Sequence, residues 1–367
     1  MALRVAFVHG RPAPHPFHGA LARAVEAEFH VVDPLLRWHD RPRTRGYRYL
    51  SWLVNALSFP RPHVYDVILS EGLHVPPVLM RSLGRLRPQQ TLVALLDNEL
   101  LYFLASERYG RMTGRVLLAA LRRYDAVICV GSMQTELARQ LLGGQGKGPL
   151  ILTVPSALSL ERWSAYSRLR PHLTSHRVLF IANGPSGWRG WYKGIDVLFR
   201  VMECLVGRCA DVRLALVGEW DVPYLKGVLG SRRDLPQWLD FVGPQADLTA
   251  ALTDAALYVH LGRGEAFGIS VLEAMAAGLP AVVSSLTGAR EAVAAVDSRL
   301  VVPLEVDRVA DTISWYLNDP LSLRQQLSER ARAAAAPYQE ARATALFRAA
   351  VQQAATAKGS SCVLSDG

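Results

Sequence analysis

Two carboxylates eight positions apart, Glu265 and Glu273, flank a predicted turn from a strand into a helix. The apolar run 257–261 predicts the strand, a glycine-rich loop follows it, and the helix is predicted to begin near Ile269. The first turn of a helix offers unpaired amide N–H groups and the positive end of the helix dipole. A diphosphate would fit this end beside Ser270, with a carboxylate on each side to hold hydroxyl groups.

A plainer interpretation makes Glu265 an ordinary loop carboxylate and Glu273 an exposed helix residue. The pattern as a whole favours the binding site, because it resembles the large retaining GT-B glycosyltransferase family numbered four. That family shows Glu-x7-Glu followed by Ala-x-x-x-Gly-x-Pro and, after the next strand, Gly-x-x-Glu. Here the matching residues are Glu265, Glu273, Ala274, Gly278 and Pro280, followed by Thr287-Gly288-Ala289-Arg290-Glu291.

The resemblance implies an enzyme that moves a sugar from a nucleotide-diphosphate donor and retains its anomeric configuration. Glu265 would hold the sugar hydroxyls, Glu273 the ribose, and Lys193 with Gly194 the diphosphate. No cofactor and no metal are expected, since the chain has no Asp-x-Asp with which metal-dependent relatives hold a divalent ion. The implied donor-binding residues are Gly10, Gly19, Asn183, Arg189, Lys193, Gly194, Glu265, Ala266, Phe267, Gly268, Ile269, Ser270 and Glu273.

Some positions depart from the family pattern. Asn183 stands where the family has an arginine, and Arg189, in a lengthened loop, is the predicted substitute. For Lys193 and Arg189 the alternative is an ordinary solvated cation. Near the first strand only Gly19 fits the place of the family's glycine pair, although Gly10 follows His9.

Asp97 is the first-half residue predicted to act in catalysis with Glu265 and Lys193. It follows the predicted strand 91–96, at a place where relatives carry His or Asp near the reacting carbon. Its alternative role, shared with Asn98, is to cap the next helix. Weaker candidates are Glu71 after another strand and His15 and His18 in a loop that also suits a simple turn.

Short β-branched runs alternate with helical segments along the chain, which indicates parallel sheets covered on both faces. The predicted strands are 4–9, 30–32, 67–70, 91–96, 126–130, 150–154, 177–182, 212–217, 239–242, 257–261, 281–284 and 299–302. Predicted helices include 19–29, 75–86, 112–124, 134–142 and 338–356.

The pattern pauses over the polar stretch 156–176, interpreted as the connection between two doubly wound α/β domains. The expected organisation is GT-B: an acceptor-side Rossmann-like domain over 1–170 and a facing nucleotide-sugar domain over 171–336. A C-terminal helix over 337–358 would cross back to the first domain, before a tail over 359–367. Ligands of such sheets bind beyond the carboxyl ends of the strands.

Composition limits the protein class. The chain of 367 residues begins directly with a strand, without the charged and apolar segments of a signal peptide, and has no apolar run of membrane-spanning length. It is therefore predicted to be cytoplasmic. Its four cysteines form no CxxC pair, which disfavours a disulfide scaffold or a zinc site.

The charge is uneven: residues 1–170 hold 22 Lys and Arg against 12 Asp and Glu, while the rest is nearly neutral. Basic clusters next to aromatic and aliphatic residues, in 41–63 and 111–123, suit an anionic membrane surface. The expected acceptor is a glycan or a lipid-linked glycan, and the enzyme would be peripheral at the inner face of the membrane. A solvated basic face is the alternative, and no nucleic-acid module pattern appears.

The sequence lacks the motifs of two other classes of nucleotide-binding enzyme. A dinucleotide oxidoreductase would need Gly-x-Gly-x-x-Gly after its first strand, and the loop 143–148 lacks the Ser or Thr of a phosphate loop. Two alternatives remain: a GT-B sugar-nucleotide epimerase or hydrolase, and a non-catalytic nucleotide-sugar-binding protein.

Overall fold

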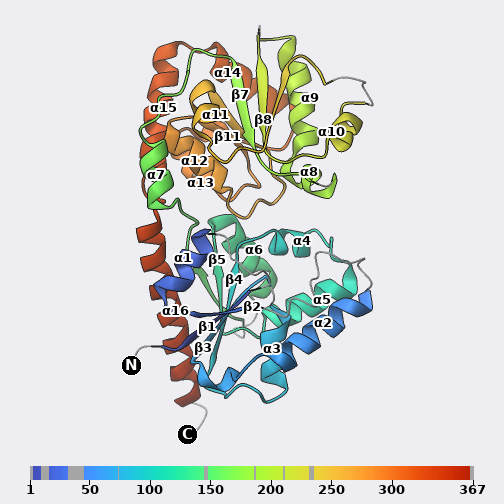
Figure 1. The fold of residues 1–367 in the computed structure, drawn as a ribbon, viewed down its shortest axis with the longest axis vertical. Helices are drawn as coiled ribbons and strands as arrows, with labels where there is room; N and C mark the ends of the chain where they lie inside the picture. The colour runs from blue at the N-terminus through green and yellow to red at the C-terminus, as the bar shows by residue number, and fades with distance from the viewer. Residues whose placement is uncertain are drawn as a thin grey trace. The chain divides into compact units, whose positions relative to one another are not determined.

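The computed structural model describes residues 3–9, 16–31, 45–72, 74–143, 148–185, 187–209, 211–230 and 235–363, without the side chains of 45–48 and 360–363. The chain divides into two compact units (Figure 1). Unit 1 comprises residues 1–156 and 340–367, and unit 2 comprises 157–339.

Unit 1 is built on a parallel sheet of six strands in the order β2-β1-β3-β4-β5-β6. Its central strands are buried along their whole length, as expected for β-branched runs covered by helices on both faces. The strands are β1 (Val5–His9), β2 (Glu28–Val31), β3 (Val67–Glu71), β4 (Thr91–Leu96), β5 (Ala126–Cys129) and β6 (Leu150–Thr153).

The helices of unit 1 connect these strands, and the C-terminal helix joins them from the far end of the chain. They are α1 (Pro16–Ala24), α2 (Arg45–Ser58), α3 (Val75–Ser82), α4 (Leu100–Ala105), α5 (Arg111–Leu121), α6 (Ser132–Leu142) and α16 (Glu340–Val363), with a 3-10 turn at Pro62–Val64. The long helix α16, in red in Figure 1, packs against α1 and approaches β4.

Unit 2 repeats the plan, with the parallel strand order β12-β11-β10-β7-β8-β9. Its strands are β7 (Arg177–Ile181), β8 (Arg213–Val217), β9 (Leu239–Gly243), β10 (Leu257–His260), β11 (Ala281–Ser284) and β12 (Val301–Val302). Its helices are α7 (Leu160–Tyr166), α8 (Gly187–Lys193), α9 (Ile195–Val206), α10 (Val222–Val228), α11 (Thr249–Asp254), α12 (Ile269–Ala277), α13 (Arg290–Ala294), α14 (Val306–Asn318) and α15 (Leu321–Ala335), with a 3-10 turn at Ser298–Leu300.

These two sheets confirm the predicted α/β fold class. In each sheet the strand order reverses once, between β1 and β3 in unit 1 and between β7 and β10 in unit 2. Loops diverge from such a reversal and leave space for a ligand beyond the carboxyl ends of the strands.

Three local predictions differ from the structure. The stretch 156–176 is not a bare connection, because it contains α7, whose helix packs on α12 within unit 2. The helix predicted over 19–29 ends at Ala24, and Glu28 already begins β2. The C-terminal helix continues to Val363, through part of the expected tail.

Candidate donor site at the strand reversal of unit 2

The loops that leave β7 and β10 carry most of the residues predicted to bind the donor. The β10 loop runs from the buried His260 to α12 and turns at two glycines in the left-handed region, Gly264 and Gly268. A residue with a side chain adopts such φ angles only at a cost, so glycine suits both turns. The loop thereby folds back over the end of β10.

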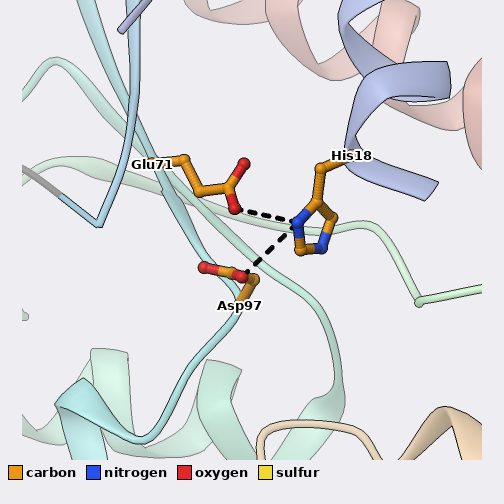
Figure 2. Close-up of side chains that lie close together, drawn as sticks. All are labelled: His18, Glu71 and Asp97. Carbon is orange, nitrogen blue, oxygen red and sulfur yellow. Dashed lines mark hydrogen bonds and ion pairs between the residues drawn. The ribbon is translucent and has the colours of Figure 1, made fainter. Parts of the chain in front are cut away.

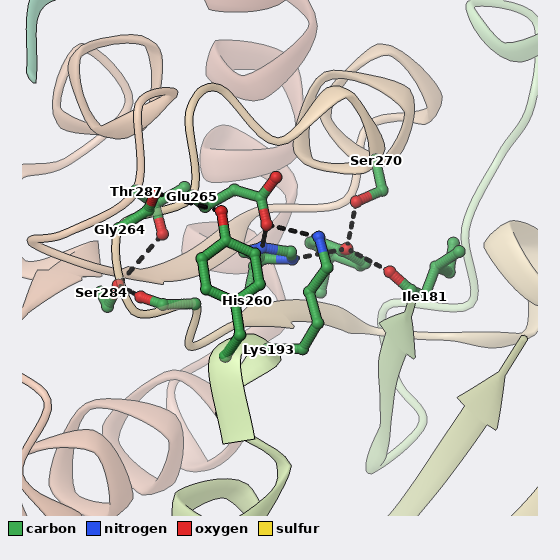
Figure 3. A network of polar contacts seen from close by, with 11 residues as sticks. Ile181, Lys193, His260, Gly264, Glu265, Ser270, Ser284 and Thr287 are labelled. Carbon is green, nitrogen blue, oxygen red and sulfur yellow. Dashed lines mark hydrogen bonds and ion pairs between the residues drawn. The ribbon is translucent and has the colours of Figure 1, made fainter. Parts of the chain in front are cut away.

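Lys193 and Glu265 meet in this space, although they are far apart in the sequence (Figure 3). Lys193 Nζ lies 2.5 Å from Glu265 Oε2, and His260 Nε2 lies 3.3 Å from the same oxygen. Burial by itself would raise the pKa of Glu265, but Lys193 and His260 outweigh it and hold this pKa well below its usual range. Glu265 is therefore a carboxylate, able to accept hydrogen bonds from hydroxyl groups.

The amino end of α12 lies next to this ion pair. Val271 N donates to Gly268 O, whereas in the described chain the amides of Ile269 and Ser270 have no protein acceptor. The buried Tyr258 donates its hydroxyl hydrogen to Ser270 Oγ over 2.8 Å. The Ser270 hydroxyl is thus free to direct its own hydrogen at a ligand, as are the two amides.

Glu273 is 3% exposed, so the alternative of an exposed helix residue is wrong. Its carboxylate pairs with Arg162, which α7 brings from the stretch predicted to be a connection. Burial nevertheless raises the pKa of Glu273, and Arg162 only partly opposes this rise. A second carboxylate therefore lies one helical turn into α12, next to a cation that the sequence pattern had not identified.

Gly194 explains why a glycine follows Lys193. Its φ is +76°, and a Cβ atom at this position would lie 2.0 Å from Leu261 O at the end of β10. Only glycine lets the start of α9 approach β10 this closely. Lys193 is held by the same approach, within reach of the β10 loop.

Three residues that the sequence pattern had not identified fix these loops to each other. Arg263 forms a bidentate ion pair with Asp196, at 2.7 and 2.8 Å. The backbone amide of Arg263 donates to Tyr192 O. Tyr192 in turn donates its hydroxyl hydrogen to Gly264 O over 3.1 Å. The α8–α9 junction and the β10 loop therefore hold each other in place. Of the three residues, only Arg263 lies within the motif loop, so only its role could have been predicted from sequence.

The segment after β11 holds the same loop from its other side. Thr287 pairs with Glu265 in an isolated bridge, and Gly288 N donates to Glu265 O over 2.9 Å. A Cβ on Gly288 would lie 2.0 Å from Ala266 O. Ala266 and Phe267 are buried, so their side chains serve packing, and contact with a ligand is left to their backbone.

Asn183 and Arg189 lie on the β7 side. Asn183 is exposed, and its Oδ1 accepts the amide hydrogen of Glu219 over 2.8 Å, which ties the β7 loop to the β8 loop. The Arg189 guanidinium lies 5.6 Å from the ring centre of Trp188 and forms no ion pair with any residue that the structure describes. Its proposed role as the missing family arginine remains a prediction.

The candidate catalytic residues from the first half of the sequence lie close together in unit 1. His18, on α1, contacts both Glu71 and Asp97 (Figure 2). His9 also contacts Glu71. Burial raises the pKa of Asp97 to about 7, while the two histidines lower the pKa of Glu71 to about 2 despite its burial. Asp97 does not cap the next helix: the N-cap of α4 is Glu99, and Asn98 Oδ1, one residue earlier, accepts from Leu100 N over 3.0 Å.

Gly19 lies in α1, beside the buried His18. Gly10 and His15 fall outside the described residues.

Comparison with known proteins bears on this geometry. Residues 186–334 match the family model described as "Glycosyl transferases group 1". This segment contains Lys193, Glu265 and α12, and it covers less than half of the chain.

Two curated relatives are named phosphatidyl-myo-inositol mannosyltransferase. The protein from Mycolicibacterium smegmatis is 38% identical over 132 residues, covering 35% of this chain and 33% of its own. The protein from Mycobacterium leprae is 30% identical over 287 residues, covering 77% of this chain and 66% of its own. The chain thus spans one third of the first relative and just under two thirds of the second.

Among solved structures, Anabaena Alr3699/HepE in complex with UDP-glucose superimposes with a TM-score of 0.69 over 96% of this chain and 100% of that one. Sequence identity is 20%, so the likeness is one of fold. It agrees with the GT-B architecture of two six-stranded parallel sheets.

Proposed function

We propose that this chain is a retaining, metal-independent glycosyltransferase that moves a sugar from a nucleotide-diphosphate donor to a hydroxyl group of a lipid-linked acceptor. The observation that carries the proposal is the cradle at the start of α12. There, the Ser270 hydroxyl and two amides without an acceptor in the described chain lie near a lysine that holds an ionised glutamate (Figure 3). The family match over residues 186–334 supports the reaction class.

The cradle provides groups for both parts of a nucleotide sugar. The amides of Ile269 and Ser270, together with Lys193, offer positive charge to the diphosphate. Glu265 accepts hydrogen bonds from the sugar hydroxyls. Glu273 gives up part of its ion pair with Arg162 and accepts hydrogen bonds from the ribose hydroxyls. Because this positive charge is preorganised, the departing diphosphate needs no divalent ion.

The reaction implied by the family resemblance then balances without a dedicated base. The bond between the anomeric carbon and the diphosphate oxygen breaks, and the acceptor oxygen bonds to that carbon from the same face. The acceptor's proton passes to the departing phosphate oxygen. The chain's own residues bind and orient the donor and stabilise the leaving charge, so loss of one of them slows the step.

The names of the relatives suggest the sugar and the acceptor. Two similar proteins are phosphatidyl-myo-inositol mannosyltransferases, so we propose mannose as the sugar and an inositol-containing phospholipid as the acceptor class. These assignments extend from the relatives to this chain and are tested by the choice of donor and acceptor below.

A lipid acceptor requires access to a membrane surface, and α2 has a suitable face. Leu50, Leu53 and Leu57 follow each other at helical spacing and are 55%, 41% and 55% exposed, while Trp52 and Ala56 point into the core. The surrounding half of the chain is strongly basic. We propose that these leucines enter an anionic bilayer surface. No helix of the described chain is long and apolar enough to span a membrane.

The donor site is tested by calorimetric titration of metal-free protein with GDP-, UDP-, ADP- and dTDP-sugars. We expect one donor to bind, and Lys193→Ala to weaken it roughly 10- to 100-fold through loss of a charged hydrogen bond. Lys226→Ala on α10 is the matched control and should bind as the unaltered protein does. Failure of every donor to bind, with or without anionic vesicles, would exclude this site.

Turnover separates the remaining functions. With the donor that binds and a phosphatidylinositol acceptor, Glu265→Gln should lower kcat roughly 100-fold. A change within a few-fold would make the role given to Glu265 wrong. Release or epimerisation of the sugar without acceptor would favour a hydrolase or an epimerase, and binding without any turnover would favour a non-catalytic protein.

Membrane contact is tested by flotation with vesicles of phosphatidylglycerol and of phosphatidylcholine. The triple change of Leu50, Leu53 and Leu57 to serine should abolish flotation with the anionic vesicles. Leu160→Ser, which alters an exposed leucine of unit 2, is the control. Equal flotation of all variants would reject α2 as the contact.

A further inference from the structure

A second group of ionisable side chains lies in unit 1, at the carboxyl ends of β1, β3 and β4 (Figure 2). His18 Nδ1 lies 2.8 Å from Glu71 Oε1 and 3.5 Å from Asp97 Oδ2. One potential ligand atom from each of these three residues lies within 4.8 Å of the others. His9 supports the group from the side, with Nε2 3.1 Å from Glu71 Oε1.

The group is buried, and two of its carboxylate oxygens lack hydrogen-bond partners among the described residues. Glu71 is 6% exposed, and its carboxylate points at His18, yet Oε2 has no hydrogen-bond partner among the described residues. Asp97 Oδ1 is buried and also lacks a partner there. Burying these two oxygens without hydrogen bonds costs free energy, and a bound cation would give both of them a partner.

The fold holds these side chains firmly. Glu71 ends a strand that is buried along its length, and Asp97 follows directly on the buried strand β4. His18 is buried in α1, which packs under α16. All three lie at the point where the strand order of unit 1 reverses, a place where α/β sheets bind ligands.

We propose that His18, Glu71 and Asp97 bind a divalent transition-metal ion of the Zn²⁺ or Mn²⁺ class. One imidazole nitrogen and two carboxylate oxygens form a ligand set that such borderline ions accept, and the two negative charges balance the ion. Ligands about 2.1 Å from a tetrahedral ion lie roughly 3.4 Å apart. The two distances from His18 Nδ1, 2.8 and 3.5 Å, therefore need to change by only about 0.6 Å or less. The carboxylate oxygens of Glu71 and Asp97 start within 4.8 Å of each other.

His9 would act as the outer partner of this site, because it hydrogen-bonds the Glu71 carboxylate and fixes its orientation. The proposal goes beyond the donor-binding function. The metal site lies in unit 1 and the diphosphate cradle in unit 2, and none of their residues is shared. Metal-free donor binding and metal binding in unit 1 are therefore separate properties, and each can fail alone.

The test uses the full chain without a histidine tag, dialysed against a chelator and titrated with Co²⁺. We expect one equivalent to give visible d–d absorption bands, and one equivalent of Zn²⁺ to abolish them by displacement. Glu71→Gln and Asp97→Asn should each weaken Co²⁺ binding at least 10-fold. Glu99→Gln, two positions from Asp97 and without a hydrogen bond from its own side chain to the described chain, should bind like the unaltered protein.

Circular dichroism and thermal melting establish that each variant is folded. If a carboxylate variant fails to fold, His18→Gln, which keeps a polar side chain, replaces it in the titration. Absence of Co²⁺ bands in the unaltered protein would overturn the proposal. Binding that persists undiminished in folded Glu71→Gln and Asp97→Asn would place the ion elsewhere and overturn it as well.

Discussion

At the scale of single residues, the candidate donor site contains an ion pair that is largely removed from water. The Lys193 and Glu265 side chains are 13% and 14% exposed, and His260 contacts the same carboxylate. Such a pair adds little net stability over an apolar replacement, but it is costly to break, because one charge is left buried without its partner. A role in ligand binding therefore explains this pair better than a contribution to stability does.

We therefore expect Lys193→Met to lower the free energy of unfolding by roughly 3 kcal/mol. The double change Lys193→Met with Glu265→Gln should recover part of this loss, since the stranded charge is gone. Urea denaturation of the single and double variants measures the difference. Strict additivity of the two single changes would show that the pair is not coupled.

The same ion pair predicts how the stability of the fold depends on pH. The folded-state pKa of Glu265 lies below its ordinary value of 4.5, so its stabilising contribution is present above that pH and is lost as the pH falls further. Unaltered protein should thus lose more stability between about pH 6 and about pH 3.5 than Lys193→Met does. Melting temperatures at both pH values test this, because contributions of other carboxylates cancel in the comparison.

At the scale of elements, glycines and one arginine set how closely helices approach strands. Both ends of α12 are glycines in the left-handed region, Gly268 and Gly278. Arg332, from α15, donates to Ala276 O of α12 and to the carbonyls that follow α7. These contacts satisfy carbonyl groups that a helix end leaves unpaired, so the cradle rests on a firmly seated helix.

Gly194→Ala is the element-scale prediction. The new Cβ would meet a backbone carbonyl at 2.0 Å in a left-handed conformation, so we expect a loss of at least about 2 kcal/mol and loss of donor binding. Gly227→Ala, within α10 and with open space around it, should be neutral or stabilise by up to about 1 kcal/mol. Equal melting temperatures of the two variants would contradict the close approach.

At the scale of the whole molecule, the chain completes its first unit with its last helix. Phe347, Val351 and Ala354 of α16 are buried, and Lys358 reaches Asp125 at 3.1 Å. Arg348 Nε donates to Ala24 O at the end of α1. Unit 1 therefore cannot finish its core until α16 has been made.

Phe347→Ala should consequently destabilise unit 1 by about 3–5 kcal/mol while the donor affinity of unit 2 stays within two-fold at low temperature. Leu346→Ala, which removes a side chain that is 40% exposed, should cost less than about 1 kcal/mol. Calorimetric melting with and without donor separates the two units. A matching fall in donor affinity would mean that the units do not respond independently.

The sequence by itself determined the elements, because their signals are local. Buried β-branched runs predicted β4 and β11 at their observed bounds, and glycine and proline marked the end of α12. The spacing of Glu265 and Glu273 predicted the candidate donor site for the same reason, since both belong to one turn between a strand and a helix.

Only the tertiary structure decided which distant residues meet. Arg162 reaches Glu273 across 111 positions, and Lys193 reaches Glu265 across 72, through loop paths that no local pattern encodes. The gathering of His18, Glu71 and Asp97 depends on strand order, because β1, β3 and β4 are neighbours only in the folded sheet. Local spacing specifies helices and strands, whereas contacts between them follow from how their apolar faces pack.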